Sequence, residues 1–167
     1  STKPIIRIGC IPENPPALPV AIEAIRDADL IVLGPGSLFT SLLPNFLVPE
    51  IVEALLKNNS PKIYISNLMT QPGETDGLDV SQHIKSIERQ LLNFGVNTRI
   101  FNSILSQGEF ERSSLIDYYR SRGAEPVICN KGRLISDGYY VLQAPLYSKK
   151  ITPTLRHDSR RLARAVL

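Results

Sequence analysis

The sequence predicts an α/β fold in which a mainly parallel sheet is covered by helices. Short apolar segments alternate along the chain with amphipathic segments, and the connections between them are short. Such alternation is typical of parallel sheets whose strands are linked by helices, and in these sheets ligands gather beyond the carboxyl ends of the strands. A chain of 167 residues can bury a real core, so we expect residues 1–167 to form a single α/β domain.

The first half of the chain predicts the order strand, helix, strand, helix, strand. Two of these strands, 30–33 and 62–66, are short apolar runs of the kind that form buried parallel strands. Residues 5–10 alternate in polarity and predict a further strand. One helix is expected to begin at the cap Asn14, with prolines tolerated in its first turn, and another to cover 51–57.

The second half predicts three more helices and three more strands. The clearest helix begins after Asp79, whose side chain can cap it together with Gln82, and it ends near Gly95. The remaining helices are expected over 113–122 and 154–167, the strands over 99–104, 126–129 and 139–144, and a turn-rich connection over 131–138.

The composition is that of an ordinary folded protein, with 43% hydrophobic and 21% charged residues. No apolar run approaches the roughly 18 residues of a membrane span, and the first residues show no signal-peptide pattern. We therefore expect a cytoplasmic protein without a membrane partner. Cys10 and Cys129 each end a short apolar run and lack metal-ligand spacing, so we expect two buried free thiols and no metal site.

The net charge is +3, but it is distributed unevenly. Residues 149–167 carry six basic side chains and one aspartate, so this segment is +5 and the remainder about −2. A basic final helix can meet phosphate or an acidic partner, or it can simply be solvated on one face. Since no aromatic residues are interleaved with these charges, we expect no nucleic-acid partner.

A glycine turn, from Gly34 to Ser37, stops the strand over 30–33 before a second apolar segment begins. Gly34 and Gly36 permit backbone angles and close approach that a Cβ would forbid. Ser37 and Thr40 place hydroxyls beside the free N–H groups of a helix start, a position that attracts phosphates. An ordinary capped turn is the alternative, because the stretch matches neither the dinucleotide fingerprint nor the P-loop.

A long polar loop, residues 67–77, follows the strand over 62–66. Loops of this length in a compact chain are often functional. Amide groups can bind the edge of a base or a sugar hydroxyl, and carboxylates can accept from a ribose or hold a divalent cation through water. A hydrogen-bonded structural loop is the alternative. The loop and the cap that follows carry these polar side chains: Asn67, Thr70, Gln71, Glu74, Thr75, Asp76 and Asp79.

Further residues can reach the same end of the sheet. His83 lies in the first turn of the helix after the polar loop and can act as a donor or acid–base group, although a lone helical histidine is more often a bystander. Of Tyr118 and Tyr119, one should pack and the other can stack on a base or sugar. Arg156 offers a charged fork for a diphosphate. His157 beside it suggests a hydrolase, but no G-x-S-x-G elbow accompanies it.

Three segments resemble a known family. Residues 28–45 begin Ala-Asp-Leu-Ile-Val-Leu-Gly-Pro-Gly-Ser, residues 67–77 read Asn-Leu-Met-Thr-Gln-Pro-Gly-Glu-Thr-Asp-Gly, and residues 155–158 read Leu-Arg-His-Asp. Together they resemble the gluconeogenesis factor family, the YvcK-like branch related to 2-phospho-L-lactate transferase (CofD). The resemblance spans nearly all of the chain, and Met-Thr-Gln-Pro-Gly-Glu-Thr is specific to the YvcK-like branch.

The resemblance implies a three-layer Rossmann-like fold, a cytoplasmic location, and a role in cell shape and in growth on gluconeogenic carbon sources. Family members begin with a strand and a glycine-rich loop, and no such loop occurs before Ile5. We therefore expect the chain to correspond to the C-terminal part of a family member and to lack the first glycine-rich strand-loop-helix unit. Exposed apolar surface should result, with either homo-oligomer formation or pairing with the missing N-terminal part.

The function that the resemblance implies is binding of a nucleotide sugar such as UDP-N-acetylglucosamine by a regulatory protein. A phospho-group transferase of the CofD type is the alternative, and an interaction module is the third possibility. We identify no catalytic nucleophile or base, so we favour a binding protein over an enzyme. The expected ligand is a UDP-sugar, with Mg²⁺ as a candidate companion.

The expected nucleotide-sugar site combines both loops with two later side chains. Because successive parallel strands end at the same edge of a sheet, the glycine turn and the polar loop should face one ligand there. The tyrosine match is loose and can shift by one residue to Tyr118. The expected site residues are Gly34, Gly36, Ser37, Thr40, Asn67, Thr70, Gln71, Glu74, Thr75, Tyr119 and Arg156.

Overall fold

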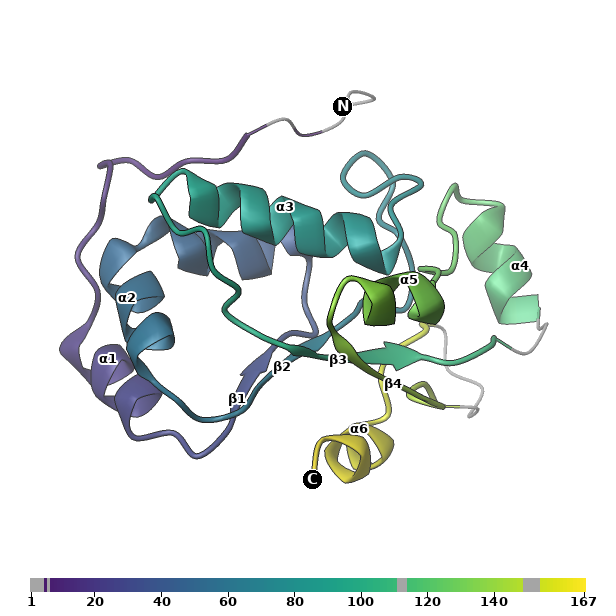
Figure 1. The fold of residues 1–167 in the computed structure, drawn as a ribbon. Coiled ribbons are helices and arrows are strands. Elements are labelled where there is room, and N and C mark those ends of the chain that lie inside the picture. The colour runs from purple at the N-terminus through teal and green to yellow at the C-terminus, as the bar shows by residue number, and fades with distance from the viewer. Residues whose placement is uncertain (1–4, 6, 111–113, 149–153) are drawn as a thin grey trace.

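A computed structural model of the protein contains a four-stranded parallel sheet flanked by helices (Figure 1). It describes residues 5, 7–110, 114–148 and 154–167. The strands lie side by side in their sequence order, and each neighbouring pair is parallel. The predicted α/β fold with a parallel sheet is therefore confirmed. The strands are β1 (Ile31–Leu33), β2 (Lys62–Ile65), β3 (Ser103–Gln107) and β4 (Tyr140–Ala144).

Helices connect the strands, and a further helix follows the last strand. They are α1 (Pro19–Arg26), α2 (Pro49–Lys57), α3 (Val80–Leu92), α4 (Ser114–Arg120), α5 (Lys131–Ser136) and α6 (Ser159–Val166), with a short π-helix η1 (Leu38–Leu42) and a 3₁₀-helix η2 (Leu43–Leu47) after β1. No single helix in the described ranges is long and apolar enough to cross a membrane. The helical segments 38–47 and 49–57 reach the length and apolarity of a membrane span only when they are counted together. The chain bends by 82° between these two segments.

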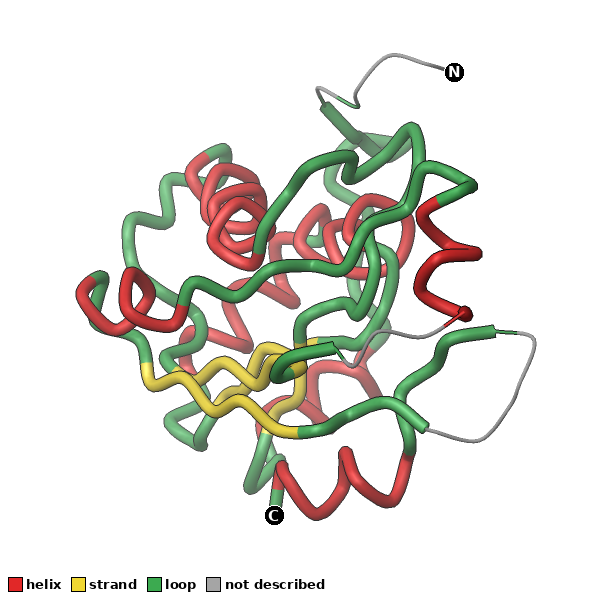
Figure 2. Tube along the Cα trace, turned by 90° about the vertical axis from the view of Figure 1, so that its right-hand side faces the viewer, coloured by secondary structure: helices red, strands yellow, loops and turns green. Residues whose placement is uncertain are grey.

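The sheet separates two apolar cores. Leu33, Tyr64 and Ile104 are aligned across β1, β2 and β3 and belong to the core beneath α2, α3 and α5. Ile65 and Leu105 are aligned in the same way but belong to the second core, which contains residues of α4 and α6. Figure 2 shows the strands with most helices on one side and the C-terminal helix on the other. This is the predicted three-layer arrangement.

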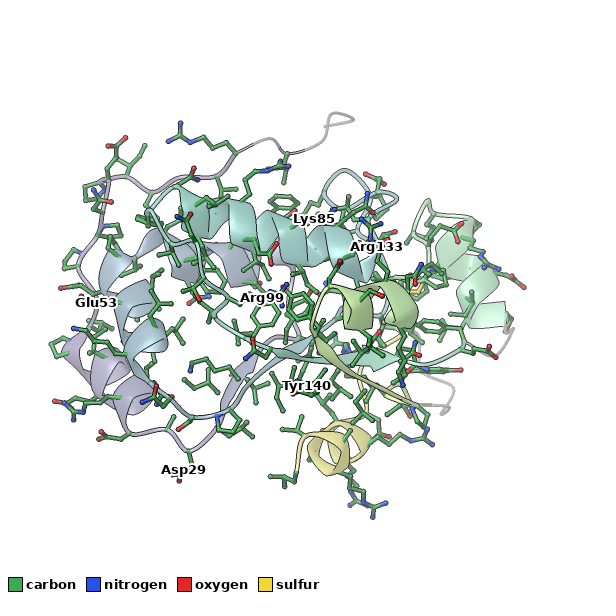
Figure 3. The ribbon with its side chains drawn as sticks, in the orientation of Figure 1. Asp29, Glu53, Lys85, Arg99, Arg133 and Tyr140 are labelled. Carbon is green, nitrogen blue, oxygen red and sulfur yellow. The ribbon has the colours of Figure 1, made fainter. Side chains whose placement is uncertain are left out.

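The sheet face on the side of α6 is only partly covered. Val32, Ile63, Ser103 and Tyr140 occupy one row across the four strands, and Tyr140 is 77% exposed. Leu142, two residues further along β4 and therefore on the same face, is 51% exposed. Tyr140 lies between the sheet and the level of α6 in Figure 3. The chain thus carries the exposed apolar surface expected from the sequence.

Two predicted strands are absent. The described residues of 5–10 form no strand, because alternating polarity does not by itself supply a neighbouring strand with which to pair. The segment 126–129 makes only one isolated antiparallel bridge, between Pro126 and Met69 of the polar loop. A proline lacks the N–H that a longer ladder would need. The strand predicted over 99–104 exists but begins at Ser103.

Several predicted helix limits were wrong. The first helix begins at Pro19 after Leu18, and Asn14 has a left-handed backbone (φ 52°) instead of capping a helix. The connection predicted over 131–138 contains α5, because the Asn130 side chain accepts a hydrogen bond from the Arg133 N–H and caps it. The last helix begins only after its cap Asp158. The predicted start of the α4 helix at position 113 lies outside the described residues.

The start of α3 agrees with its prediction in detail. The Asp79 carboxylate accepts from the Gln82 N–H at 2.8 Å, and the Gln82 side chain accepts from the Asp79 N–H at 2.8 Å. This reciprocal capping box satisfies two backbone donors that the helix itself leaves unpaired. It therefore defines where the polar loop ends.

We predict that Asp79→Ala lowers the free energy of unfolding by about 1 kcal/mol, the usual cost of losing a helix cap. Urea denaturation followed by circular dichroism measures the change. Asp29→Ala is the matched control, because Asp29 is an exposed aspartate that points away from the molecule (Figure 3). Equal stability of the two variants would contradict a stabilising role for the capping box.

Candidate functional site

A cleft of about 850 Å³ opens beyond the carboxyl ends of β1 and β2. Its volume is within the range of roughly 300–1,000 Å³ that is typical of small-molecule sites. The lining comes from the glycine turn, the polar loop, α4 and the segment before α6, which are far apart in the sequence. The lining residues are Pro35, Gly36, Ser37, Ser41, Asn67, Leu68, Met69, Thr70, Gln71, Tyr119, Leu155, Arg156 and His157.

Most of the predicted site residues line this cleft, and the others do not. Those that line the cleft are Gly36, Ser37, Asn67, Thr70, Gln71, Tyr119 and Arg156. Those that do not are Gly34, Thr40, Glu74 and Thr75, and their contacts show that they support the two loops. Arg156, the most distant in sequence, meets the glycine turn and the polar loop in one cleft.

Gly34 supports the glycine turn through its backbone. It has φ +94°, a conformation that side chains disfavour, and a Cβ at this position would lie 2.9 Å from the Ile65 carbonyl oxygen. The turn therefore packs directly on the end of β2. This close approach brings the glycine turn beside the polar loop, which starts two residues later at Asn67.

A hydrogen bond joins the two loops. The Ser37 hydroxyl donates to the Glu74 carboxylate at 2.9 Å, and the Thr40 hydroxyl donates to Ser37 Oγ at 2.7 Å. Ser37 also caps η1 by accepting from the Thr40 N–H. Thr40 and Glu74 thus hold Ser37 in place, and Glu74 puts a half-buried carboxylate against the turn where a phosphate was predicted.

Thr70 and Thr75 stabilise the polar loop through hydrogen bonds to backbone groups. Thr75 is fully buried, and its hydroxyl oxygen accepts from the Gln71 N–H at 2.8 Å. Thr70 exchanges two hydrogen bonds with the backbone of Glu125, one from its own N–H at 2.7 Å and one to its hydroxyl at 2.8 Å. These bonds fix the backbone that carries Asn67 and Gln71 into the cleft.

Tyr119 positions the segment before α6. Its hydroxyl oxygen accepts from the Leu155 N–H at 3.0 Å, so the ring lines the cleft while the hydroxyl holds the chain that carries Arg156 and His157. Arg156 is exposed at the cleft. Tyr118, the alternative considered from the sequence, is 46% exposed and stacks under the Arg122 guanidinium instead.

Three buried polar atoms of the cleft have no hydrogen-bond partner among the described residues. They are Asn67 Oδ1, Gln71 Oε1 and His157 Nε2. Buried polar atoms in folded proteins are nearly always paired, so a group of unpaired ones around a single cleft is typical of a ligand site. All three can accept a hydrogen bond in their assigned orientation.

His157 was considered from the sequence only as part of a hydrolase pattern and was not assigned to the site. Its ring contacts the Ser66 backbone carbonyl, and its backbone forms an isolated bridge with Tyr147. Burial lowers the pKa of His157, and the Ser66 contact acts weakly in the opposite direction. No local sequence signal indicates these contacts, because they join the end of β2 to a segment before the last helix.

Other candidates lie outside the cleft. His83 is fully buried on α3, with Nδ1 2.8 Å from the Asp79 carbonyl oxygen, and burial lowers its pKa. Asp76 accepts from the Gly73 N–H, and Asp79 caps α3. Among the described residues, no three histidine, cysteine or carboxylate side chains lie together as a metal site would require.

The fold and the cleft define an α/β protein of the Rossmann-like kind with a candidate small-molecule site at the carboxyl edge of its parallel sheet. Residues 1–147 match the family described as 2-phospho-L-lactate transferase CofD. The chain belongs to the CofD family, as its sequence segments had indicated.

Relatives within this family are named as gluconeogenesis factors. The one from Halalkalibacterium halodurans is 40% identical over 99% of this chain and 49% of its own length, and the one from Bacillus subtilis is 37% identical over 95% and 48%. A relative from Nostoc sp. is 39% identical over 98% of this chain and 35% of its own length. The chain therefore spans between a third and a half of these relatives.

A solved structure shares the fold. The crystal structure of a UPF0052 family member from Bacillus halodurans is 38% identical, with a TM-score of 0.89. The similarity covers 99% of this chain and 51% of that one. Both the sequence and the backbone arrangement thus assign the chain to the same family.

We predict that Gly34→Ala lowers the free energy of unfolding by more than about 2 kcal/mol, because a left-handed backbone and a clash with the Ile65 carbonyl act together. Urea denaturation measures the loss. In Gly9→Ala the new methyl group meets no atom within 4 Å, so its change should stay within about 0.5 kcal/mol. A Gly34→Ala variant as stable as this control would show that the turn can move away from β2.

Proposed function

We propose that this chain forms the binding cleft of a nucleotide-sugar-binding regulatory protein of the gluconeogenesis factor type, with UDP-N-acetylglucosamine as the candidate ligand. The observation that supports the proposal is one cleft in which the glycine turn, two loop amides and Arg156 meet. Cell shape and growth on gluconeogenic carbon sources are the processes we propose that it serves. The relatives that carry the gluconeogenesis factor name are consistent with this role.

Charge indicates how a diphosphate would lie in the cleft. The Glu74 carboxylate, bonded to Ser37, repels an anion placed directly on that side of the glycine turn. The Arg156 guanidinium is a charged fork among the residues that line the cleft, whereas Glu74 does not line it. We therefore place the diphosphate near Arg156, and the uncharged sugar or nucleoside groups toward the amides of Asn67 and Gln71.

A CofD-type transferase is the alternative, and the match to the transferase family favours it. Phospho-group transfer usually requires a metal held by carboxylates together with cationic partners. Glu74, Asp76 and Asp79 are each occupied in loop or cap hydrogen bonds. Incubation of the chain with UDP-N-acetylglucosamine, Mg²⁺ and 2-phospho-L-lactate as the acceptor, followed by mass spectrometry, separates the two functions: a product that joins donor and acceptor groups supports the transferase, and saturable binding without turnover supports the regulatory protein.

We predict that Arg156→Ala weakens binding of UDP-N-acetylglucosamine about tenfold, which corresponds to about 1.4 kcal/mol. A hydrogen bond to a charged group typically contributes about 1.5 to 3 kcal/mol, and exposure of the guanidinium reduces that value. Isothermal titration calorimetry at low and moderate salt measures the affinity.

Arg160→Ala is the matched control for this measurement. Arg160 is an exposed arginine on α6, so its loss removes the same charge without touching the residues that line the cleft. A similar loss of affinity in both variants would mean that only the overall positive charge matters. An unchanged affinity in a folded Arg156→Ala variant would argue against this binding site.

A further inference from the structure

We propose that His157 selects the ligand of the cleft by accepting a hydrogen bond, at Nε2 of its neutral ring, from a hydroxyl or N–H group of the nucleotide sugar. The inference rests on the proposed function, because it concerns the same cleft. It adds a specificity-determining residue that discriminates a neutral donor group from a phosphate oxygen.

The surroundings of the ring decide its tautomer. The His157 ring lies against the Ser66 backbone carbonyl, and its Nε2 has no partner among the described residues. We therefore assign the contact with Ser66 to Nδ1. Since a carbonyl oxygen only accepts, Nδ1 carries the proton in the neutral ring, and Nε2 is left as a free acceptor.

The contact between the His157 ring and Ser66 is rigid. Ser66 is 1% exposed, its N–H donates to the Leu105 carbonyl, and its hydroxyl donates to Ser106 Oγ at 3.1 Å. The Ser66 carbonyl therefore belongs to a residue that directly follows β2 and is hydrogen-bonded to β3. On the other side, Tyr119 holds the Leu155 N–H two residues before His157. The Ser66 carbonyl and the hydrogen bond between Tyr119 and Leu155 therefore both restrict the position of the His157 ring.

Nε2 is one of three unpartnered acceptors that belong to residues of the cleft. His157 lines the same cleft as Asn67 and Gln71, and the side-chain oxygens of those two residues are likewise buried and without a partner among the described residues. Three acceptors around one space match a ligand group with several hydrogen-bond donors, such as the hydroxyls of a sugar or ribose. A phosphate group, which presents only acceptors, would leave them unpaired.

Ligand affinity should depend on pH. Protonation converts Nε2 from an acceptor into a donor, so the affinity should fall as the ring becomes charged. Because burial lowers the pKa of His157, this loss should occur below the usual histidine value of about 6.5. Side chains other than histidine do not ordinarily change charge between pH 5.5 and 8. The ionisable groups on the elements around His157 are Tyr119, Tyr147, Arg156, Asp158 and Arg161.

The test compares variants that keep different nitrogens. His157→Asn preserves an amide N–H where Nδ1 reaches Ser66 but removes the group at Nε2, whereas His157→Gln places its amide near Nε2. Calorimetry with UDP-N-acetylglucosamine at pH 7.5 should show about a tenfold loss for the asparagine variant, equivalent to about 1.4 kcal/mol, and a smaller loss for the glutamine variant. Thermal unfolding of each variant monitors folding.

The pH profile supplies a readout that a structural role would not change. The wild-type chain should lose affinity between pH 7.5 and 5.5, but by less than about tenfold, because a ring whose pKa lies below 6.5 is only partly protonated at pH 5.5, and His157→Asn should be nearly flat over that range. His83→Asn is the matched control, because His83 is the other histidine of the chain and also has a buried, unpartnered Nε2. It lies outside the cleft, so this variant should keep the wild-type profile.

A comparison with UDP locates the donor group. If His157→Asn lowers the affinity for UDP-N-acetylglucosamine but not for UDP, the donor group lies in the sugar. If it lowers the affinity for both ligands, the donor group lies in the uridine. Either result supports the acceptor role of His157. A ¹H–¹⁵N spectrum of the imidazoles tests the tautomer without ligand, and a protonated Nε2 at pH 7.5 would overturn the inference.

The remaining outcomes separate this inference from the proposed function. Failure of the wild-type chain to bind UDP-N-acetylglucosamine at any pH would overturn the proposed function and this inference with it. Wild-type binding that His157→Asn leaves intact, or that both substitutions weaken equally in folded protein, would overturn only the role of His157.

Discussion

The parallel register of β1, β2 and β3 is the constraint on which the rest of the structure depends. Leu33, the last residue of β1, is aligned with Tyr64, one residue before the end of β2, so these two strands end at about the same level, whereas β3 continues beyond Ile104 to Gln107. Because they also run in the same direction, the glycine turn after β1 and the polar loop after β2 leave the sheet at the same edge. Antiparallel neighbours would have sent these two loops to opposite edges, and the cleft between them would not exist.

Around the cleft, the side chains that support the loops differ from those whose polar atoms are left unpaired. The hydroxyls of Thr40, Thr70 and Thr75 are engaged in hydrogen bonds that hold the loops, and the hydroxyl of Tyr119 holds the segment before α6. The atoms left unpaired belong instead to two amides and an imidazole. A rigid frame with unpaired polar atoms facing one space is suited to binding, because little conformational entropy remains to be lost when a ligand enters.

The sequence predicted the parts of this fold that depend on local pattern. The apolar runs at 30–33 and 62–66 became β1 and β2, and the capping box of Asp79 and Gln82 starts α3 as expected. The predictions that failed lacked such a local cause. Residues 5–10 have the alternation of a strand, but those of them that the structure describes form no strand, and Asn14 precedes prolines but adopts a left-handed backbone. The cap Asn130 was missed because the helix that it starts is only six residues long.

The sequence by itself determined the class of fold, the two loops at one sheet edge and most of the residue types that line the cleft, because periodicity, glycines and caps act over a few neighbouring residues. Only the tertiary structure decided which of those residues face the cleft. The hydroxyl of Tyr119 and the N–H of Leu155 are 36 positions apart, and Thr70 and Glu125 are 55 apart. Some polar side chains form hydrogen bonds with such distant partners, and others are left free to bind a ligand. Which of the two occurs depends on contacts between distant segments, which no local pattern encodes. For the same reason the sequence did not indicate that His157 lines the cleft beside the glycine turn and the polar loop.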